Sequence, residues 1–330
     1  MPSPTSHQRR TLLILGIAAV VACVVGVFVG PVGYSPGEVI RALLDPAAPD
    51  AGIIRGLRLP RAALGFAVGG SLAVAGATLQ AVVGNPLAEP WLLGLSGGAS
   101  LGAVIGIVIG LPPGWSVAIM ATVGALIAIA LVYRVALVAG RRLDTRVLLL
   151  AGVVVGAFAG AVSAALLAIA DPFTFRAAAL WLFGGFSGAE WHATLRFVAI
   201  ATPALVAIGW LGRGLDLLAL GDETAAALGA DVTRVRRYAV LATAVLTAAT
   251  VSVAGVIGFV GLVVPHAVRW RTGPLHGRLF PAVFLAGGAF TVLADTVART
   301  VLGGQELPVG VITALVGVPI FAVLLRRSAA

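Results

Sequence analysis

Long apolar runs without a charged side chain set the strongest constraint on how this chain can fold. A membrane-spanning helix needs about 20 such residues, and runs on this scale occupy residues 11–30, 62–84, 91–110, 115–133, 147–170, 279–294 and 307–325. Charged residues make up only 11% of the chain, against about 25% in soluble proteins, so a water-soluble fold could not cover its surface. The sequence therefore predicts an all-α polytopic membrane protein.

Two further regions determine how many spans the chain has. The run 197–212 is short, but the residues from Ala193 onward extend it to the length of a span. The run 238–265 is too long for one untilted helix and too short for two. Gly255, Gly258 and Gly261 interrupt it before Pro265 and predict a break, with a second span continuing towards Arg269. These regions raise the total to nine or ten spans.

The distribution of arginines along the chain favours ten spans over nine. Basic residues concentrate in cytoplasmic loops, and an arginine pair stands at each end of the chain, before the first span and after the last. If both pairs are cytoplasmic, the number of crossings is even. With ten spans, fifteen of the 22 arginines lie inside and seven outside. We therefore predict ten transmembrane helices, both termini in the cytoplasm, and a short cytoplasmic tail over residues 1–10.

Composition also excludes several functions. The formal net charge of +9 comes entirely from arginine, because the chain has no lysine, and in a membrane protein it indicates lipid contact and no nucleic-acid partner. Without lysine there is no Walker A phosphate loop. The single cysteine, Cys23, cannot form an internal disulfide. Because the apolar run continues beyond Cys23, a retained first helix is favoured over a lipoprotein cleavage site.

Two segments fit neither a span nor a plain loop. Residues 31–60, expected outside, combine Pro, Gly and mixed charge and predict a short surface helix. Residues 172–190, also outside, are rich in aromatic side chains around Gly184 and Gly185. They are too few to cross the membrane, so they form either a half-helix tucked into the outer mouth or an interfacial aromatic belt. The sequence favours neither alternative.

A short internal similarity indicates an inverted repeat. Ala73-Val74-Ala75-Gly76 is followed by Pro86, and Val253-Ala254-Gly255 is followed by Pro265 at the same interval. The two copies lie on spans of opposite predicted direction, as in transporters whose pathway runs between inverted halves. The matching residues are common in this chain, so a chance match is the competing explanation.

The densest group of motifs lies within residues 58–102. Its small residues allow helix backbones to approach closely, which is how helices associate in lipid. A polar, proline-containing turn follows, and such non-helical backbone is tolerated only beside water or protein. The motifs are Arg58-Leu59-Pro60-Arg61, Gly69-Gly70-Ser71-Leu72-Ala73-Val74-Ala75-Gly76, Asn85-Pro86-Leu87-Ala88-Glu89-Pro90 and Leu93-Gly94-Leu95-Ser96-Gly97-Gly98-Ala99.

With these motifs and those that follow, the chain resembles the permease subunits of type II ABC importers for iron chelates, haem and cobalamin. The resemblance extends from about Arg55 to Arg327. The later motifs include Leu149-Leu150-Ala151-Gly152, Leu220-Gly221, Ala226-Ala227-Leu228-Gly229, Gly258-Phe259-Val260-Gly261-Leu262-Val263-Val264-Pro265-His266, Ala294-Asp295, Ala298-Arg299 and Glu306-Leu307-Pro308-Val309-Gly310.

The resemblance implies an architecture and a set of partners. The whole chain, residues 1–330, would be one permease domain of inverted-repeat type in the bacterial inner membrane. A second copy would complete the pathway at the homodimer interface. Two ATPase subunits would bind ATP and Mg on the cytoplasmic side, and a substrate-binding protein would dock outside. The chain itself would bind no cofactor and no metal, and it would not be an enzyme.

Residues 213–237 form the predicted contact with the ATPase. They mix acidic residues with four arginines and are expected inside. Asp222 is a suitable N-cap and Gly229 a suitable residue after the helix end, so Glu223–Leu228 predicts a helix too short to be stable alone. Ala226 and Leu228 give it an apolar side that needs a partner. In the resembling permeases this segment is the coupling helix. The alternative is a loop helix that packs on its own protein.

Outer arginines are the candidates for docking the substrate-binding protein. Arg55, Arg58 and Arg61 follow one another at intervals of three, and Arg299 matches a further docking position of the resembling family. The guanidinium fork suits carboxylates on a partner, while anchoring to lipid phosphates is the alternative. Asp295 lies four residues before Arg299, a spacing that favours an ion pair, so we expect it to hold Arg299.

The remaining candidates concern the substrate path. The resemblance assigns Asn85 and Leu87 to the inner gate and Thr145 to the other gate region, and Arg176 on segment 172–190 is also a candidate for the path. His266 follows Pro265 near the inner face, where a structural role at a helix end is favoured over metal or haem ligation. There is no Cys/His cluster, so any metal would pass as a complex.

Function is predicted at the level of transport, with the substrate open. The leading interpretation is the permease of an ABC importer for an iron chelate, siderophore or haem, and cobalamin is the alternative within the family. The segment Trp181–Phe186 with Trp191 resembles cobalamin permeases. An ion-coupled secondary transporter would need buried ionisable relays, and only Asp295 offers one. A membrane-embedded enzyme is weaker still, because the spans contain no catalytic constellation.

Overall fold

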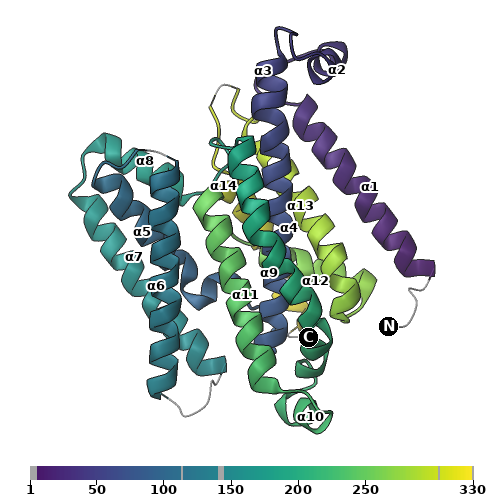
Figure 1. Ribbon diagram of the computed structural model, residues 1–330, viewed down its shortest axis with the longest axis vertical. Helices are drawn as coiled ribbons and strands as arrows, with labels where there is room; N and C mark the ends of the chain where they lie inside the picture. Colours follow the sequence, from purple (N-terminus) through teal and green to yellow (C-terminus); the bar gives the residue numbers. More distant parts are fainter. Residues whose placement is uncertain (1–5, 113, 140–144, 304, 329–330) are drawn as a thin grey trace.

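The computed structural model describes residues 6–112, 114–139, 145–303 and 305–328, and this part of the chain is helical without strands. Figure 1 shows an upright bundle in which α4 is central and α5–α8 form one side. The helices are α1 (Ser6–Phe28), α2 (Pro36–Leu44), α3 (Ala51–Ile53), α4 (Leu59–Val83), α5 (Leu95–Val108), α6 (Trp115–Ala139), α7 (Thr145–Ala168), α8 (Pro172–Leu182), α9 (Trp191–Leu218), α10 (Asp222–Ala227), α11 (Val232–Ala254), α12 (Val260–Thr272), α13 (His276–Ala298) and α14 (Val309–Ser328).

Among the described residues, seven helices are long and apolar enough to cross a membrane: α1, α3 continued into α4, α6, α7, α9, α11 and α13. A helix stands at each of the ten positions where a span was expected, but α5, α12 and the apolar part of α14 are shorter. The number of crossings and the side on which the termini lie therefore remain predictions. Both termini lie in the lower half of Figure 1, as does α10, whereas α2 and α3 lie at the top.

The expected surface helix and the expected break in residues 238–265 are both present. Ser35 and the side chain of Glu38 form a capping box that starts α2, which satisfies two of the free amide groups at its N-terminus. The break separates α11 from α12 between Gly255 and Phe259, both of which have positive φ angles. A bulky residue rarely adopts this conformation, so the surrounding contacts hold Phe259 there.

The aromatic segment 172–190 combines features of both alternatives. It forms the short helix α8, whose Phe173 is largely exposed, while Phe186 beyond its end is fully buried. The backbone after α8 is tucked between two other helices: the Gly185 amide donates to the Ala254 carbonyl, and the Gly184 carbonyl accepts from Val309. The segment thus joins the end of α11 to the start of α14.

The short internal similarity does not correspond to equivalent structures. Gly76 lies in the interior of α4, whereas Gly255 lies just beyond the end of α11 with φ 63°. Pro86 lies in a turn, whereas Pro265 lies inside α12. The shared Val-Ala-Gly sequence therefore occurs in two different backbone conformations, and it carries no argument for an inverted repeat.

Close backbone contacts make α4 the centre of the bundle. Its apolar window is 83% buried, compared with 22–28% for α1, α6, α7 and α9. A Cβ on Gly69 would overlap the carbonyl oxygen of Gly287 in α13, and a Cβ on Gly76 would overlap that of Gly261 in α12. Small residues allow helices to approach in this way in lipid, where no hydrophobic force drives them together.

The packing predicts that Gly76→Val destabilises the protein strongly. Overpacking costs about 1–3 kcal/mol, and here the obstacle is backbone that cannot rotate away. We expect a lower melting temperature in detergent and loss of the monodisperse peak in size-exclusion chromatography. Gly16→Val is the control, because a Cβ on Gly16 in α1 meets nothing. Equal behaviour of the two variants would contradict the packing described.

Candidate functional site

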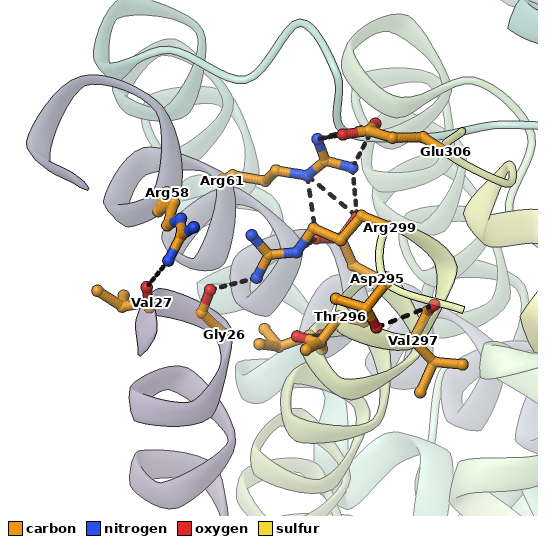
Figure 2. Close-up of polar contacts among 11 residues, drawn as sticks. Gly26, Val27, Arg58, Arg61, Asp295, Thr296, Val297, Arg299 and Glu306 are labelled. Carbon is orange, nitrogen blue, oxygen red and sulfur yellow. Dashed lines mark hydrogen bonds and ion pairs between the residues drawn. The ribbon is translucent and has the colours of Figure 1, made fainter. Parts of the chain in front are cut away.

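At the end of the bundle that carries α2 and α3, which is the predicted outer end and is called the outer end below, one arginine joins two carboxylates. Figure 2 shows the guanidinium of Arg61 between Asp295 and Glu306. Its Nε and one terminal nitrogen donate to Asp295 at 2.9–3.1 Å, and both terminal nitrogens donate to Glu306 at 3.0–3.1 Å. Paired contacts of this kind are the strongest that arginine makes. They tie α4 to α13 and to the segment before α14.

Two further arginines in this cluster bind the C-terminal end of α1. Arg58 donates to the carbonyl oxygens of Val27 at 3.2 Å and Phe28 at 3.1 Å, and Arg299 donates to that of Gly26. The last carbonyls of a helix have no partner within it and carry the negative end of the helix dipole. Two guanidinium groups therefore satisfy them, and α1 is fixed to α4 and α13 (Figure 2).

The structure gives three of the four docking candidates partners inside the chain. Arg58 and Arg299 are each 4% exposed, and Arg61 is engaged by both carboxylates, whereas Arg55 is exposed. The expected pair of Asp295 and Arg299 is confirmed, with 3.5 Å between Oδ2 and Nε. The sequence analysis missed that Arg61 is the principal partner of Asp295, because their separation along the chain gives no periodic signal. Docking by these arginines remains a prediction.

The unequal burial of the two carboxylates predicts unequal losses of stability. The side chain of Asp295 is 4% exposed and that of Glu306 is 41% exposed. Asp295→Ala leaves buried guanidinium groups without their counter-charge, which costs about 3–5 kcal/mol. Glu306→Ala removes a half-exposed partner and costs about 0–1 kcal/mol. Melting temperatures of the two variants in detergent measure the difference, and equal losses would contradict the burial.

The predicted inner gate is a compact polar turn after α4. Gly84, with φ 66°, ends the helix, as expected of a residue that tolerates the left-handed conformation. The side chain of Asn85 accepts a hydrogen bond from the Leu87 amide at 2.9 Å. Asn85 is exposed and Leu87 half-buried. These contacts hold the turn in shape, and the gate role of both residues remains a prediction.

Glu89 connects this turn to the break between α11 and α12. Its Oε1 accepts a hydrogen bond from the Phe259 amide at 2.6 Å, at the residue that precedes α12 and has a positive φ. Burial raises the pKa of Glu89 to about 7, although the bond from Phe259 opposes this shift. The sequence analysis quoted Glu89 within a motif but gave it no role, because only the fold brings it to Phe259.

The raised pKa of Glu89 predicts how the stability of the folded protein changes with pH. Between about pH 4.5 and 7 the folded protein retains a proton on Glu89 that the unfolded chain releases, so this group's contribution to stability falls as the pH rises through that range. Glu89→Gln cannot ionise. Its melting temperature relative to wild type should therefore be higher at pH 8 than at pH 5. A difference that does not change with pH would contradict the assignment.

The predicted coupling helix is present, with one correction. It runs over Asp222–Ala227, and its N-cap is Gly221 rather than Asp222. Asp222 instead pairs with Arg236 at 2.7 Å, which joins α10 to α11. Gly229 has the expected positive φ. Segment 213–237 is also less loop-like than expected, because α9 extends to Leu218 and α11 starts at Val232.

Helix α10, the predicted coupling helix, presents part of its surface to solvent. Glu223 and Ala226 are exposed and Leu228 is 60% exposed, whereas Ala225 is fully buried. Packing on the rest of the chain therefore accounts for Ala225 and, through the pair with Arg236, for Asp222, but not for Ala226 or Leu228. Ala226 and Leu228 are therefore accessible to a partner, and the predicted ATPase contact remains a prediction.

Other candidates lie apart from these sites. Arg176 is exposed on α8, and Thr145 starts α7, with its side chain outside the described part of the structure. His266 lies inside α12 rather than at its end and packs edge-on against Trp270. No group of three potential metal-ligating side chains occurs among the described residues. His276 was not anticipated: its ring nitrogen lies 2.6 Å from Asp216, which ties α13 to α9.

The long apolar helices and the close glycine contacts between them are those of a polytopic membrane protein. The sequence profile of the FecCD transport family matches residues 17–327, so the chain belongs to this family of type II importer permeases. As such it is a multi-pass inner-membrane protein and not itself an enzyme. Permeases of this family act with ATPase and substrate-binding partners.

Individual relatives agree with this assignment. The chain is 45% identical over 277 residues to the cobalamin import system permease BtuC of Halobacterium salinarum, covering 83% of this chain and 73% of that protein. It is 40% identical to the vitamin B12 import system permease BtuC of Vibrio cholerae, over 97% of this chain and 95% of that protein. A solved structure described as an inward-facing metal-chelate type ABC transporter matches with TM-score 0.85 and 27% identity, over 97% of this chain and 99% of the other.

Proposed function

We propose that this chain is the permease subunit of an ABC importer for cobalamin. The observation that carries the proposal is the similarity, across nearly the full length, to permeases named for cobalamin or vitamin B12 import. These relatives favour cobalamin over the iron chelate that led the sequence analysis. The aromatic segment around Trp181 and Trp191 points in the same direction, since it resembles cobalamin permeases.

The proposed assembly contains a second copy of this chain, two ATPase subunits and a substrate-binding protein. ATP and Mg would bind to the ATPase subunits, in agreement with the absence of lysine and hence of a Walker A loop from this sequence. The substrate would pass between the two copies. Exposed Arg55 at the outer end and exposed Leu228 at the inner end are available for the outer and inner partners.

Ion coupling is a weaker mechanism for this chain. It requires a buried group that can exchange a proton or bind an ion. Asp295 is the candidate named in the sequence analysis, but its carboxylate is paired with Arg61 and Arg299. Its oxygens are already engaged by these two guanidinium groups, so it offers no free carboxylate to bind a transported ion.

Uptake measurements test the substrate. A bacterial strain that lacks its own cobalamin permease would express this chain with its cognate ATPase and binding protein. We expect uptake of radiolabelled cyanocobalamin. We expect no uptake when the Walker A lysine of the ATPase is replaced and the ATPase is inactive. Uptake of ferric siderophore or haem in place of cobalamin would overturn the cobalamin assignment. Uptake by the permease alone under a proton gradient would overturn the ABC mechanism.

A charged substitution at Leu228, just beyond the C-terminal end of α10, should weaken ATPase binding specifically. Leu228→Asp places a charge in the proposed contact and should reduce co-purification of the ATPase at least tenfold, because a buried unpaired charge is costly. Since Leu228 is 60% exposed in the free chain, the variant should fold and elute normally. Leu220→Asp, at a similarly exposed leucine before α10, is the control. ATPase recovery at the wild-type level would exclude Leu228 from the contact.

A further inference from the structure

An apolar groove runs between α9 and α11, which pack side by side (Figure 1). Its volume is about 470 Å³, and it contains no charged side chain. Trp210 is 85% exposed at one end of it. The lining residues are Ile200, Pro203, Ala204, Ala207, Trp210, Leu211, Tyr238, Leu241, Ala242 and Val245.

The length of the groove matches one leaflet of a membrane. Its lining on α9 extends from Ile200 to Leu211, which at 1.5 Å per residue is about 16 Å. Half of the hydrocarbon core of a bilayer is about 15 Å. Trp210 and Tyr238 lie at the end nearer α10, and such amphipathic rings prefer the level of the lipid headgroups. The groove thus has the length and the aromatic boundary that an acyl chain requires.

A basic hollow continues from the same end. Its volume is about 660 Å³ and its lining consists of Asp231, Thr233, Arg234, Arg237 and Tyr238, so Tyr238 is common to both cavities. Arg234 lies 3.4 Å from Asp231, which partly neutralises it. Arg237 is exposed and makes no ion pair within the described part of the chain. The three charges leave the hollow with one net positive charge.

We propose that the α9–α11 groove and this basic hollow form a binding site for one anionic phospholipid. An acyl chain lies along the groove and the phosphate lies between Arg234 and Arg237, with the Thr233 and Tyr238 hydroxyls available as donors. A soluble partner does not account for the groove, because the groove lies at the depth of the spans. A second copy does not account for the basic hollow, because identical positive surfaces repel. The inference is independent of the transported substrate.

Native mass spectrometry of the purified chain tests the headgroup half of the site. Phosphatidylglycerol and phosphatidylcholine with identical acyl chains are the probes. We expect wild type to retain phosphatidylglycerol preferentially. Arg237→Gln should lower its affinity about fivefold and Arg234→Gln with Arg237→Gln about twentyfold or more, as expected for about 1 kcal/mol per arginine, with phosphatidylcholine unchanged. Arg271→Gln, at an exposed arginine of α12, is the control and should behave as wild type.

A second variant tests the groove itself. Ala207→Phe fills the groove and should reduce binding of both lipids, whereas Thr202→Phe, at an exposed position of α9 outside the lining, should not. An unchanged lipid count for Ala207→Phe would overturn the proposal, since headgroup attraction alone would then explain the preference. Equal retention of the two lipids by wild type would overturn it as well. The proposal would also be overturned if the arginine variants lost ATPase binding but retained phosphatidylglycerol at the wild-type level.

Discussion

Contact of backbone against backbone along α4 is the constraint on which the rest of the structure depends. Lipid gives apolar helices no reason to prefer one another, so their association rests on close packing and polar contacts. Gly69 against Gly287 and Gly76 against Gly261 bring α13 and α12 to α4 more closely than any side chain would allow. The other helices then pack around this buried group.

Polar contacts fix the two ends of the same helix. At the outer end, Arg61 holds α13 through Asp295, and Arg58 extends to the carbonyls that end α1. At the inner end, the turn after α4 reaches the start of α12 through Glu89 and Phe259. A buried ion pair contributes little net stability but is costly to break. These contacts therefore specify which helices lie next to one another more than they add to stability.

The predicted contacts with the substrate-binding protein and with the ATPase lie at opposite ends of the molecule. The arginines that resemble docking residues are mostly engaged within the chain, and this leaves Arg55 free at the outer end. At the opposite end, α10 presents Leu228 to solvent while its pair with Arg236 ties it to α11. The other end of α11 lies at the break before α12, where Glu89 accepts a hydrogen bond from Phe259. Helix α11 therefore extends from the predicted ATPase contact to the turn that contains the predicted gate residues.

The sequence by itself determined the helical membrane class, the positions of the helices, the break near Gly255 and the short helix α10, because apolar run length, glycine and capping residues act locally. It also anticipated the pair of Asp295 and Arg299, whose members lie one helical turn apart. Only the tertiary structure decided that Arg61 is the main partner of Asp295, that Glu89 reaches Phe259 and that His276 pairs with Asp216. These contacts join residues far apart in the chain, and whether a charged side chain is buried against a neighbour or exposed depends on which helices pack together.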